Sequence, residues 1–234
     1  MPVFGLHLSG DNLREGTIIA RTPSGTVSSV ATAFGPVKTI TAISNAAEAS
    51  VSSVAHGFSV GDVVEITSGW AKLNKRAYRI KTSTADAFTL EQADTSNVVL
   101  YSPGGAAGSV RKVLTWVQLT NTLNPNSSGG EAKKVTYKFT ESDIEYSIND
   151  GFSAVDRSFD MDADAITTPG YQALRTLTEV QSDTIMRKIA KSGATSYLPC
   201  TINLNEEEVE QDGQIVVVRV SVSGNAKSTR YATA

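Results

Sequence analysis

Of all the motifs in the sequence, a glycine–serine–glycine motif most resembles part of a catalytic centre. The motif GFSVG at residues 57–61 fits the pattern G-x-S-x-G, which in an α/β-hydrolase holds a nucleophilic serine between a strand and a helix. Here the next residues, Asp62–Ile66, predict a strand. The hydrolase order also needs a histidine after the serine, and both histidines, His7 and His56, precede it. We therefore interpret the motif as a tight β-turn whose glycines supply unusual backbone angles.

Alternating aspartates give a second chemical pattern. Asp160, Asp162 and Asp164 resemble the start of a calcium-binding loop. Such a loop has Gly at its sixth position and Glu at its twelfth, where this chain has Ala165 and Tyr171. The pattern is better explained by aspartates that precede the N-terminus of a helix, because the helix dipole favours carboxylates there.

Each of the remaining candidate motifs also lacks a residue or a feature that its chemistry requires. The acidic run Glu206–Glu210 predicts a solvated hairpin tip, or alternatively a surface that repels DNA, because catalytic carboxylate pairs need a sheltered cleft. Cys200 is the only cysteine, and we expect a small buried strand residue rather than a catalytic thiol. Residues 104–108 are glycine-rich but lack the ending of a phosphate loop. No cluster has metal-ligand spacing. We expect neither catalysis nor a cofactor or metal.

Composition narrows the classes of protein further. The 234 residues suffice for one large domain, or for one with a smaller domain inside it, and 40% apolar residues fit a globular core. A net charge of -3 argues against gripping nucleic acid through a basic face, but not against enclosing it. Because we find no signal-peptide pattern and no apolar run of membrane-spanning length, we expect a soluble protein made in a cytoplasm, with no membrane partner.

Short runs rich in Val, Ile, Thr and Phe predict a mainly β chain. Thr17–Arg21 and Thr26–Ala31 flank a turn signal and predict a hairpin. The alternation over Val135–Phe139 predicts a half-buried strand. The strongest strand is Ile215–Val222, and an Asp-Gly turn joins it to its expected partner, Tyr197–Val209.

One helix is convincing. Thr168 is a suitable N-cap, Pro169 fits the first turn, and Tyr171, Leu174 and Leu177 recur near helical spacing. The fold class is therefore mainly β, with one flanking α-helix.

Residues 37–112 differ from the rest and predict an inserted small β-barrel domain inside a host formed by residues 1–36 and 113–234. The segment carries about +2 and leaves about -5 for the host. Insertions succeed when their ends lie close together on a surface loop. Its expected strands are Thr39–Ile43, Ala49–Val54, Asp62–Thr67, Ala77–Lys81 and Ala87–Gln92.

This segment resembles the first catalytic cysteine half-domain of ubiquitin-activating enzymes, a small β-domain found inserted in many phage structural proteins. The resemblance spans Ile40–Val110 and is carried by AHGFSVGDVV at 55–64, LNKRAY at 73–78, TADAFTL at 84–90 and DTS at 94–96. It implies a β-barrel decoration without ubiquitin chemistry.

The host resembles the major tail tube proteins of lambda-like phages in the order of its parts. An N-terminal hairpin is followed by a long polar loop over Thr140–Asp156, then by FDMD at 159–162, TPGYQAL at 168–174, the strand Ile185–Ile189 and a C-terminal hairpin with a trailing arm from Gly224. The resemblance implies a tail-tube-type β-sandwich whose hexameric rings stack into a tube that conducts DNA during ejection. We expect the polar, Gly- and Ser-rich arms at both ends to order only on assembly.

The resemblance also gives candidate assembly residues. The polar loop would stack rings through Asp143, Glu145, Asp150 and Asp156. The lumen sheet would present Thr136, Lys138, Arg219 and Ser221.

The implied partners are further copies of the chain and the tape measure, terminator and distal tail proteins, with DNA passing the lumen without specific binding. The implied location is the virion tail, after assembly in the host cytoplasm. Alternatives are a tail terminator, a capsid decoration protein, or a carbohydrate-binding β-sandwich. The last needs exposed aromatics on one loop face, whereas Trp70 and Trp116 are far apart in sequence and simplest as core or rim residues.

Overall fold

The computed structural model describes residues 22–232 and confirms the mainly β fold. Within that range one α-helix, α1 (Pro169–Val180), follows a short 3-10 helix, η1 (Ala163–Thr167). The strands run in this order: β1 (Val27–Phe34), β2 (Lys38–Ile40), β3 (Ala42–Ile43), β4 (Ser50–Ser52), β5 (Val63–Ser68), β6 (Arg76–Ser83), β7 (Ala87–Leu90), β8 (Gly108–Leu119), β9 (Thr122–Gly129), β10 (Ala132–Tyr137), β11 (Tyr146–Phe152), β12 (Val155–Asp162), β13 (Thr184–Ile189), β14 (Thr195–Val209), β15 (Val217–Gly224) and β16 (Thr229–Tyr231).

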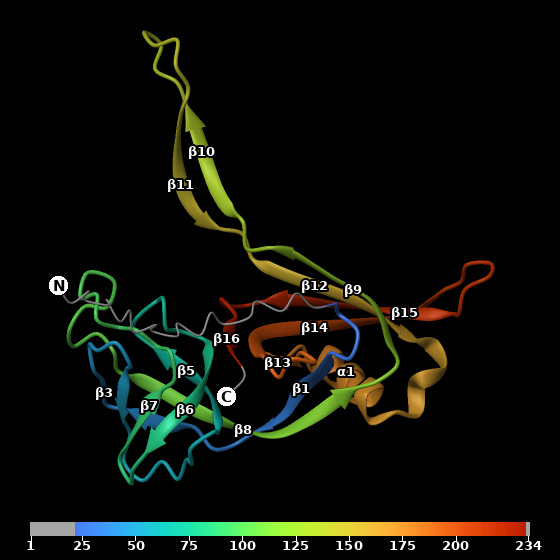
Figure 1. The fold of residues 1–234 in the computed structure, drawn as a ribbon, viewed down its shortest axis with the longest axis horizontal. Helices are drawn as coiled ribbons and strands as arrows, with labels where there is room; N and C mark the ends of the chain where they lie inside the picture. The colour runs from blue at the N-terminus through green and yellow to red at the C-terminus, as the bar shows by residue number, and fades with distance from the viewer. Residues whose placement is uncertain (1–21, 233–234) are drawn as a thin grey trace, which may run out of the picture.

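A single hydrogen-bonded path links most of the strands, in the order β3-β4-β7-β6-β5-β8-β1-β13-β14-β15-β12-β9, with β2 on β8 and β16 on β14. The long strand β14 turns this path into two layers, because its first half pairs with β13 and its second half with β15. Figure 1 shows β12, β14 and β15 above β1 and β8, with α1 between β14 and β8.

The host core lies between these layers. Val218, Val220 and Val222 alternate inward along β15 and are almost fully buried. They share one hydrophobic cluster with Met161 of β12 and Leu174 of α1. The helix starts as its sequence predicts, because the Thr168 side chain accepts a hydrogen bond from the Tyr171 N–H at 3.3 Å.

A second hydrophobic cluster lies within the segment 37–112 and is built around Ile66, Trp70, Tyr78, Phe88 and Leu90. Strand β8 joins it to the host. The first half of β8 pairs with β2 and β5, and its second half pairs with β1. The expected boundary at residues 112 and 113 therefore falls inside one continuous strand.

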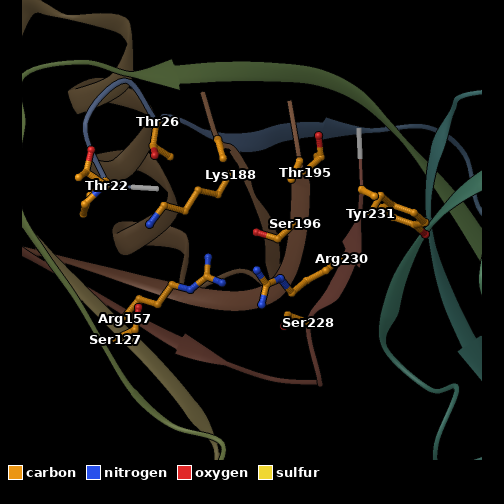
Figure 2. Close-up of a pocket in the computed structure, with 14 residues that line it drawn as sticks. Thr22, Thr26, Ser127, Arg157, Lys188, Thr195, Ser196, Ser228, Arg230 and Tyr231 are labelled. Atoms are coloured by element: carbon orange, nitrogen blue, oxygen red, sulfur yellow. The ribbon is translucent and has the colours of Figure 1, made fainter. Parts of the chain in front are cut away.

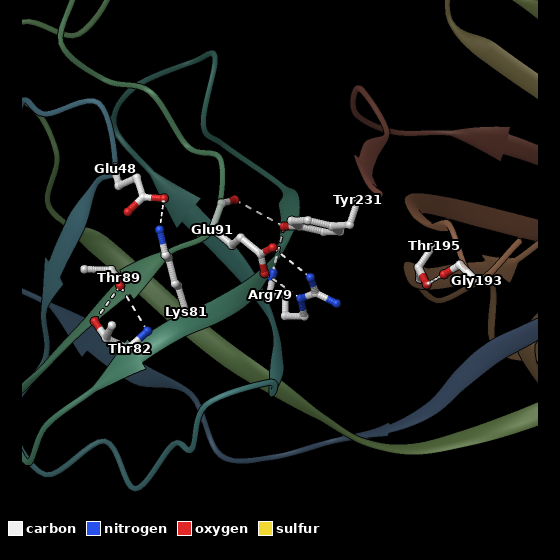
Figure 3. A network of polar contacts seen from close by, with 9 residues as sticks. All are labelled: Glu48, Arg79, Lys81, Thr82, Thr89, Glu91, Gly193, Thr195 and Tyr231. Atoms are coloured by element: carbon white, nitrogen blue, oxygen red, sulfur yellow. Dashed lines mark hydrogen bonds and ion pairs between the residues drawn. The ribbon is translucent and has the colours of Figure 1, made fainter. Parts of the chain in front are cut away.

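Strand β16, the last described strand, packs between the host and the segment 37–112. Tyr231 of β16 is 2% exposed and lies in a third cluster with Ala77 of β6, Val113 of β8 and Ile185 of β13. Its Oη accepts a hydrogen bond from the Arg79 N–H at 2.9 Å (Figure 3). The C-terminal segment thus fixes the insert against the host.

Three expectations about the terminal and loop segments need correction or comment. The trailing arm from Gly224 is ordered within the single chain up to residue 232, because β16 pairs with β14 and buries Tyr231. The half-buried strand over Val135–Phe139 is wrong: the strand is β10, and all its residues are exposed because only β11 pairs with it. Strand Thr17–Arg21 lies outside the described residues.

Candidate assembly interface

The serine motif forms the β-turn that its glycines predict. The Asp62 N–H donates to the Ser59 carbonyl at 3.1 Å, and the Ser59 N–H donates to Asp62 Oδ2 at 2.7 Å. Gly57 and Gly61 have φ values of 71° and 87°. The nearby His56 is buried against Phe58 and Phe88. Its Nδ1 accepts the Phe58 N–H at 2.9 Å, so the ring packs in the insert core.

The aspartate pattern caps a helix. Asp162 Oδ1 accepts a hydrogen bond from the Asp164 N–H at 3.1 Å at the start of η1. Asp160 instead accepts from Asn124 Nδ2 of β9 at 2.9 Å. Among residues 22–232, no group of three or more His, Cys, Asp or Glu side chains could hold a metal ion. No helix in the same range is long and apolar enough to cross a membrane.

The most prominent surface is a projecting hairpin, here called the arm, formed by β10, β11 and the turn between them. Figure 1 shows it extending away from both layers. The two strands pair with each other and with no other described strand. The long polar loop expected over Thr140–Asp156 is therefore a turn, then β11, then the start of β12.

One side of the arm is apolar, although no residue of the described range 22–232 covers it. Val135 lies opposite Ile148, and Tyr137 lies opposite Tyr146 with their rings stacked 5.6 Å apart. Directly opposed residues point to the same side, so these four side chains form one surface. Ile148 is 57% exposed, and Phe139 beyond the strand is 55% exposed. We call this surface the apolar arm face.

The candidate stacking residues are divided between the arm and its base. Asp143 lies in the turn at the tip, Glu145 precedes β11, and Asp150 lies within β11; all three are exposed. Asp156 is placed elsewhere, on β12, where it pairs with Ser223 of β15.

The candidate lumen residues also separate. Thr136 and Lys138 belong to the arm, on and just beyond β10, whereas Arg219 and Ser221 point outward from β15 in the main sheet. The structure does not bring these two pairs onto one sheet.

Arg219 and Ser221 belong to a larger surface, here called the polar sheet face, most of which is not predicted from the sequence. In one row across four strands, Asn203 of β14, Ser221, Ser158 of β12 and Asn126 of β9 are neighbours. The next row places Asn205, Arg219 and Asp160 side by side. The signal was present in the alternation of Asn203 and Asn205 with buried Ile202 and Leu204.

Among the described strands, the sheet below this face ends in a free edge. Strand β9 pairs with β12 on one side and is the last strand of the path. It contains Pro125, a residue that central strands exclude. An edge strand presents unpaired backbone groups that another chain can pair with.

Three other residues that the sequence singled out have structural roles. Burial raises the pKa of the Cys200 thiol to about 12, which leaves it unreactive near neutral pH. Trp70 is buried in the insert core and donates its Nε1–H to the Ser102 carbonyl at 2.8 Å. Trp116 is partly buried against the third cluster, under the Arg187 guanidinium.

Among the described residues, the unpaired edge of β9 and the exposed arm face are surfaces that suit a structural protein working by association. A family model described as phage tail tube protein matches residues 68–233, more than two thirds of the chain. The chain belongs to the phage tail tube protein family, whose members are structural and not enzymatic. No curated protein matches it. The family match begins inside the segment 37–112, and the resemblance of that segment to a half-domain of ubiquitin-activating enzymes stays a prediction.

Proposed function

We propose that this chain forms rings, most simply hexamers, which stack into the tube that conducts DNA during ejection. The observation that carries the proposal is the apolar arm face. An isolated two-stranded hairpin is marginal in water, and exposed aromatic and aliphatic side chains mark sites of protein contact. In a family of tail tube proteins, the natural cover for this face is a second copy in the adjacent ring.

The polar sheet face suits the wall of a DNA channel. Its side chains are mostly Ser and Asn, and its only charged residues in the two rows above are Arg219 and Asp160, which lie opposite each other. DNA phosphates bind strongly to clustered Lys and Arg side chains, so a surface without a basic patch binds DNA only weakly. Arg219 and Ser221 are accordingly proposed as lumen residues, while a lumen position for Thr136 and Lys138 stays a prediction.

Ring closure would use the free edge of β9, because pairing with a neighbouring copy satisfies its backbone groups and removes the edge. The segment 37–112 is proposed as a decoration domain on the outside of the tube. It lies at the opposite end of the strand order from β9, away from the polar sheet face. The proposed further partners are the tape measure, terminator and distal tail proteins, with assembly in the host cytoplasm.

The test removes apolar contact area from the arm without touching the core. The double variant Tyr137→Ser, Ile148→Ser is expected to fold like the wild type, because both side chains are exposed and pack on no cluster. A matched control swaps an opposed pair on the polar side of the arm, Thr136→Ser with Ser147→Thr. Electron microscopy should show tubes for the wild type and the control, and single rings or monomers for the double variant. Tubes of normal length from the double variant would contradict a stacking role for the arm.

A further inference from the structure

The root of the arm holds an apolar groove, here called the root groove. It has a volume of about 540 Å³ and lies between the end of β11, the start of β12 and the turn that follows β15. Its apolar lining includes Phe152, Ala154, Val155 and Ala226. Phe152 is 76% exposed, so most of a large aromatic ring lies in water. A contiguous apolar surface of this kind marks a site of contact with another protein.

A bulge in β11 separates the root groove from the apolar arm face. Across the arm, Ala132 lies opposite Phe152 and Lys134 lies opposite Asn149, so β11 has one more residue between these pairs than β10. Ala132 and Lys134 share one side of β10, because side chains alternate along a strand. Phe152 therefore lies on the polar side of the arm. The root groove is a second contact surface at this end of the molecule.

The root groove carries a positive charge. Among the described residues that line it, Lys227 is the only charged one. Lys227 is exposed and forms no ion pair within residues 22–232. Ser228 also lines the groove, and together with Arg230 it lines the neighbouring cavity that Figure 2 shows. A partner that offers both apolar side chains and carboxylates would match this surface.

The same chain carries such an element. The acidic hairpin, residues 205–216, joins β14 to β15 and holds five carboxylates without a Lys or Arg. It also exposes two large apolar side chains, because Ile215 is 55% and Val216 is 37% exposed. Both residues directly precede β15. The hairpin therefore combines the two properties that the root groove requires of a partner.

The root groove and the acidic hairpin lie at opposite ends of one sheet. In the pairing of β12 with β15, Asp156 lies opposite Ser223 beside the groove, and Asp162 lies opposite Val217 beside the hairpin. The six residue steps between these pairs span roughly 20 Å, so the two surfaces of one chain cannot touch. Figure 1 shows the arm and the hairpin leaving the sheet at opposite ends. This placement fits a head-to-tail contact between identical copies.

We propose that the acidic hairpin of one copy docks in the root groove of the next copy along the tube. Ile215 would pack on Phe152, and a carboxylate of the hairpin would pair with Lys227. The inference rests on the proposed tube, and it adds a second stacking contact beside the apolar arm face. A head-to-tail contact can repeat without limit, as a growing tube requires. The opposite charges would also favour the correct end of an incoming copy.

Single substitutions test the apolar part of the contact. Phe152→Ser and Ile215→Ser should each raise the protein concentration needed for tubes about tenfold or more. The thermal midpoint should not change, because both side chains are exposed and belong to no core cluster of the described chain. Val99→Ser is the matched control, since Val99 is an apolar residue of the insert that is 88% exposed. Tubes at the wild-type concentration from either groove or hairpin variant would contradict the docking.

Cysteine crosslinking gives the decisive result. The variant Ala154→Cys, Gln214→Cys places one exposed thiol in the groove and one beside Ile215, while the native Cys200 is buried. Because these two positions lie at opposite ends of one chain's sheet, a short bismaleimide can join them only between copies. Tubes of this variant should give a ladder of covalent multimers, and each single-cysteine variant should give monomers on a denaturing gel.

Tubes of the double-cysteine variant without a ladder would overturn the docking. So would a crosslinked dimer of Ala154→Cys alone, because that result would place two grooves against each other. In both cases wild-type tubes would leave the proposed function intact. A wild type that forms no tubes would overturn the proposed function and the docking together.

Discussion

Cys200 shows how burial turns a potentially reactive residue into a structural one. Its side chain is fully buried in the host core, and burial raises the pKa of its thiol to about 12. At pH 8 a thiol with that pKa is ionised in roughly one molecule in ten thousand. We therefore expect no labelling of the folded chain by iodoacetamide at pH 8 within hours, and complete labelling in denaturant. Fast labelling of the folded chain, read by mass spectrometry, would contradict its burial.

Tyr231 allows a sharper test because its hydroxyl has a defined partner. In Tyr231→Phe the Arg79 N–H, which now donates to the Tyr231 Oη at 2.9 Å, loses its partner. The expected loss in the free energy of unfolding is about 1–3 kcal/mol, measured by urea denaturation. Tyr146→Phe is the control, since that tyrosine is 41% exposed on the arm. Equal stability of both variants would show that the C-terminal strand does not hold the insert.

Among the elements, the arm was the hardest to predict. The alternation over Val135–Phe139 correctly indicated a two-sided strand, but periodicity cannot tell whether a core or another chain covers its apolar side. The prediction that the C-terminal arm orders only on assembly failed for a different reason. Its Gly and Ser residues indicated a loose arm, while the element is held by one large side chain, Tyr231, whose site is built by β6 and β13.

Other elements were predicted well because their determinants are local. The helix start follows from the Thr168 cap and Pro169, and the β14–β15 hairpin follows from its Asp-Gly turn, where Gly213 has a φ of 75°. The polar sheet face was only half found, because its rows join four strands whose neighbours are distant in sequence. A register between distant strands is a tertiary property.

The acidic residues of the arm give a prediction at the same scale. The triple variant Asp143→Asn, Glu145→Gln, Asp150→Asn should leave the thermal midpoint unchanged, because the three side chains are exposed and form no ion pair within the described residues. Tube growth should be impaired, because these residues would lie in the contact between rings. Asp164→Asn, at an exposed position in the first turn of η1, is the control. Tubes of normal length in the triple variant, seen by electron microscopy, would remove these residues from the stacking contact.

For the whole molecule, the two projecting parts should contribute differently to stability. Replacing residues 133–151 by a short turn removes an arm that packs on no core cluster, so the thermal midpoint should stay within a few degrees. Replacing residues 37–107 by a short linker exposes Tyr231 and the third cluster, so the midpoint should fall clearly. Calorimetry of both deletion variants measures this difference. An insert deletion as stable as the wild type would show that the segment is an independent appendage.

The central claim is that the chain is a tube subunit whose polar sheet face lines the channel. Cryo-electron microscopy of the purified full chain tests it most directly. We expect hollow tubes of stacked rings, with Arg219 and Ser221 facing the lumen, the arm between rings and the insert outside. Particles that remain monomeric at high protein concentration, or tubes whose channel is lined by the insert, would contradict the account.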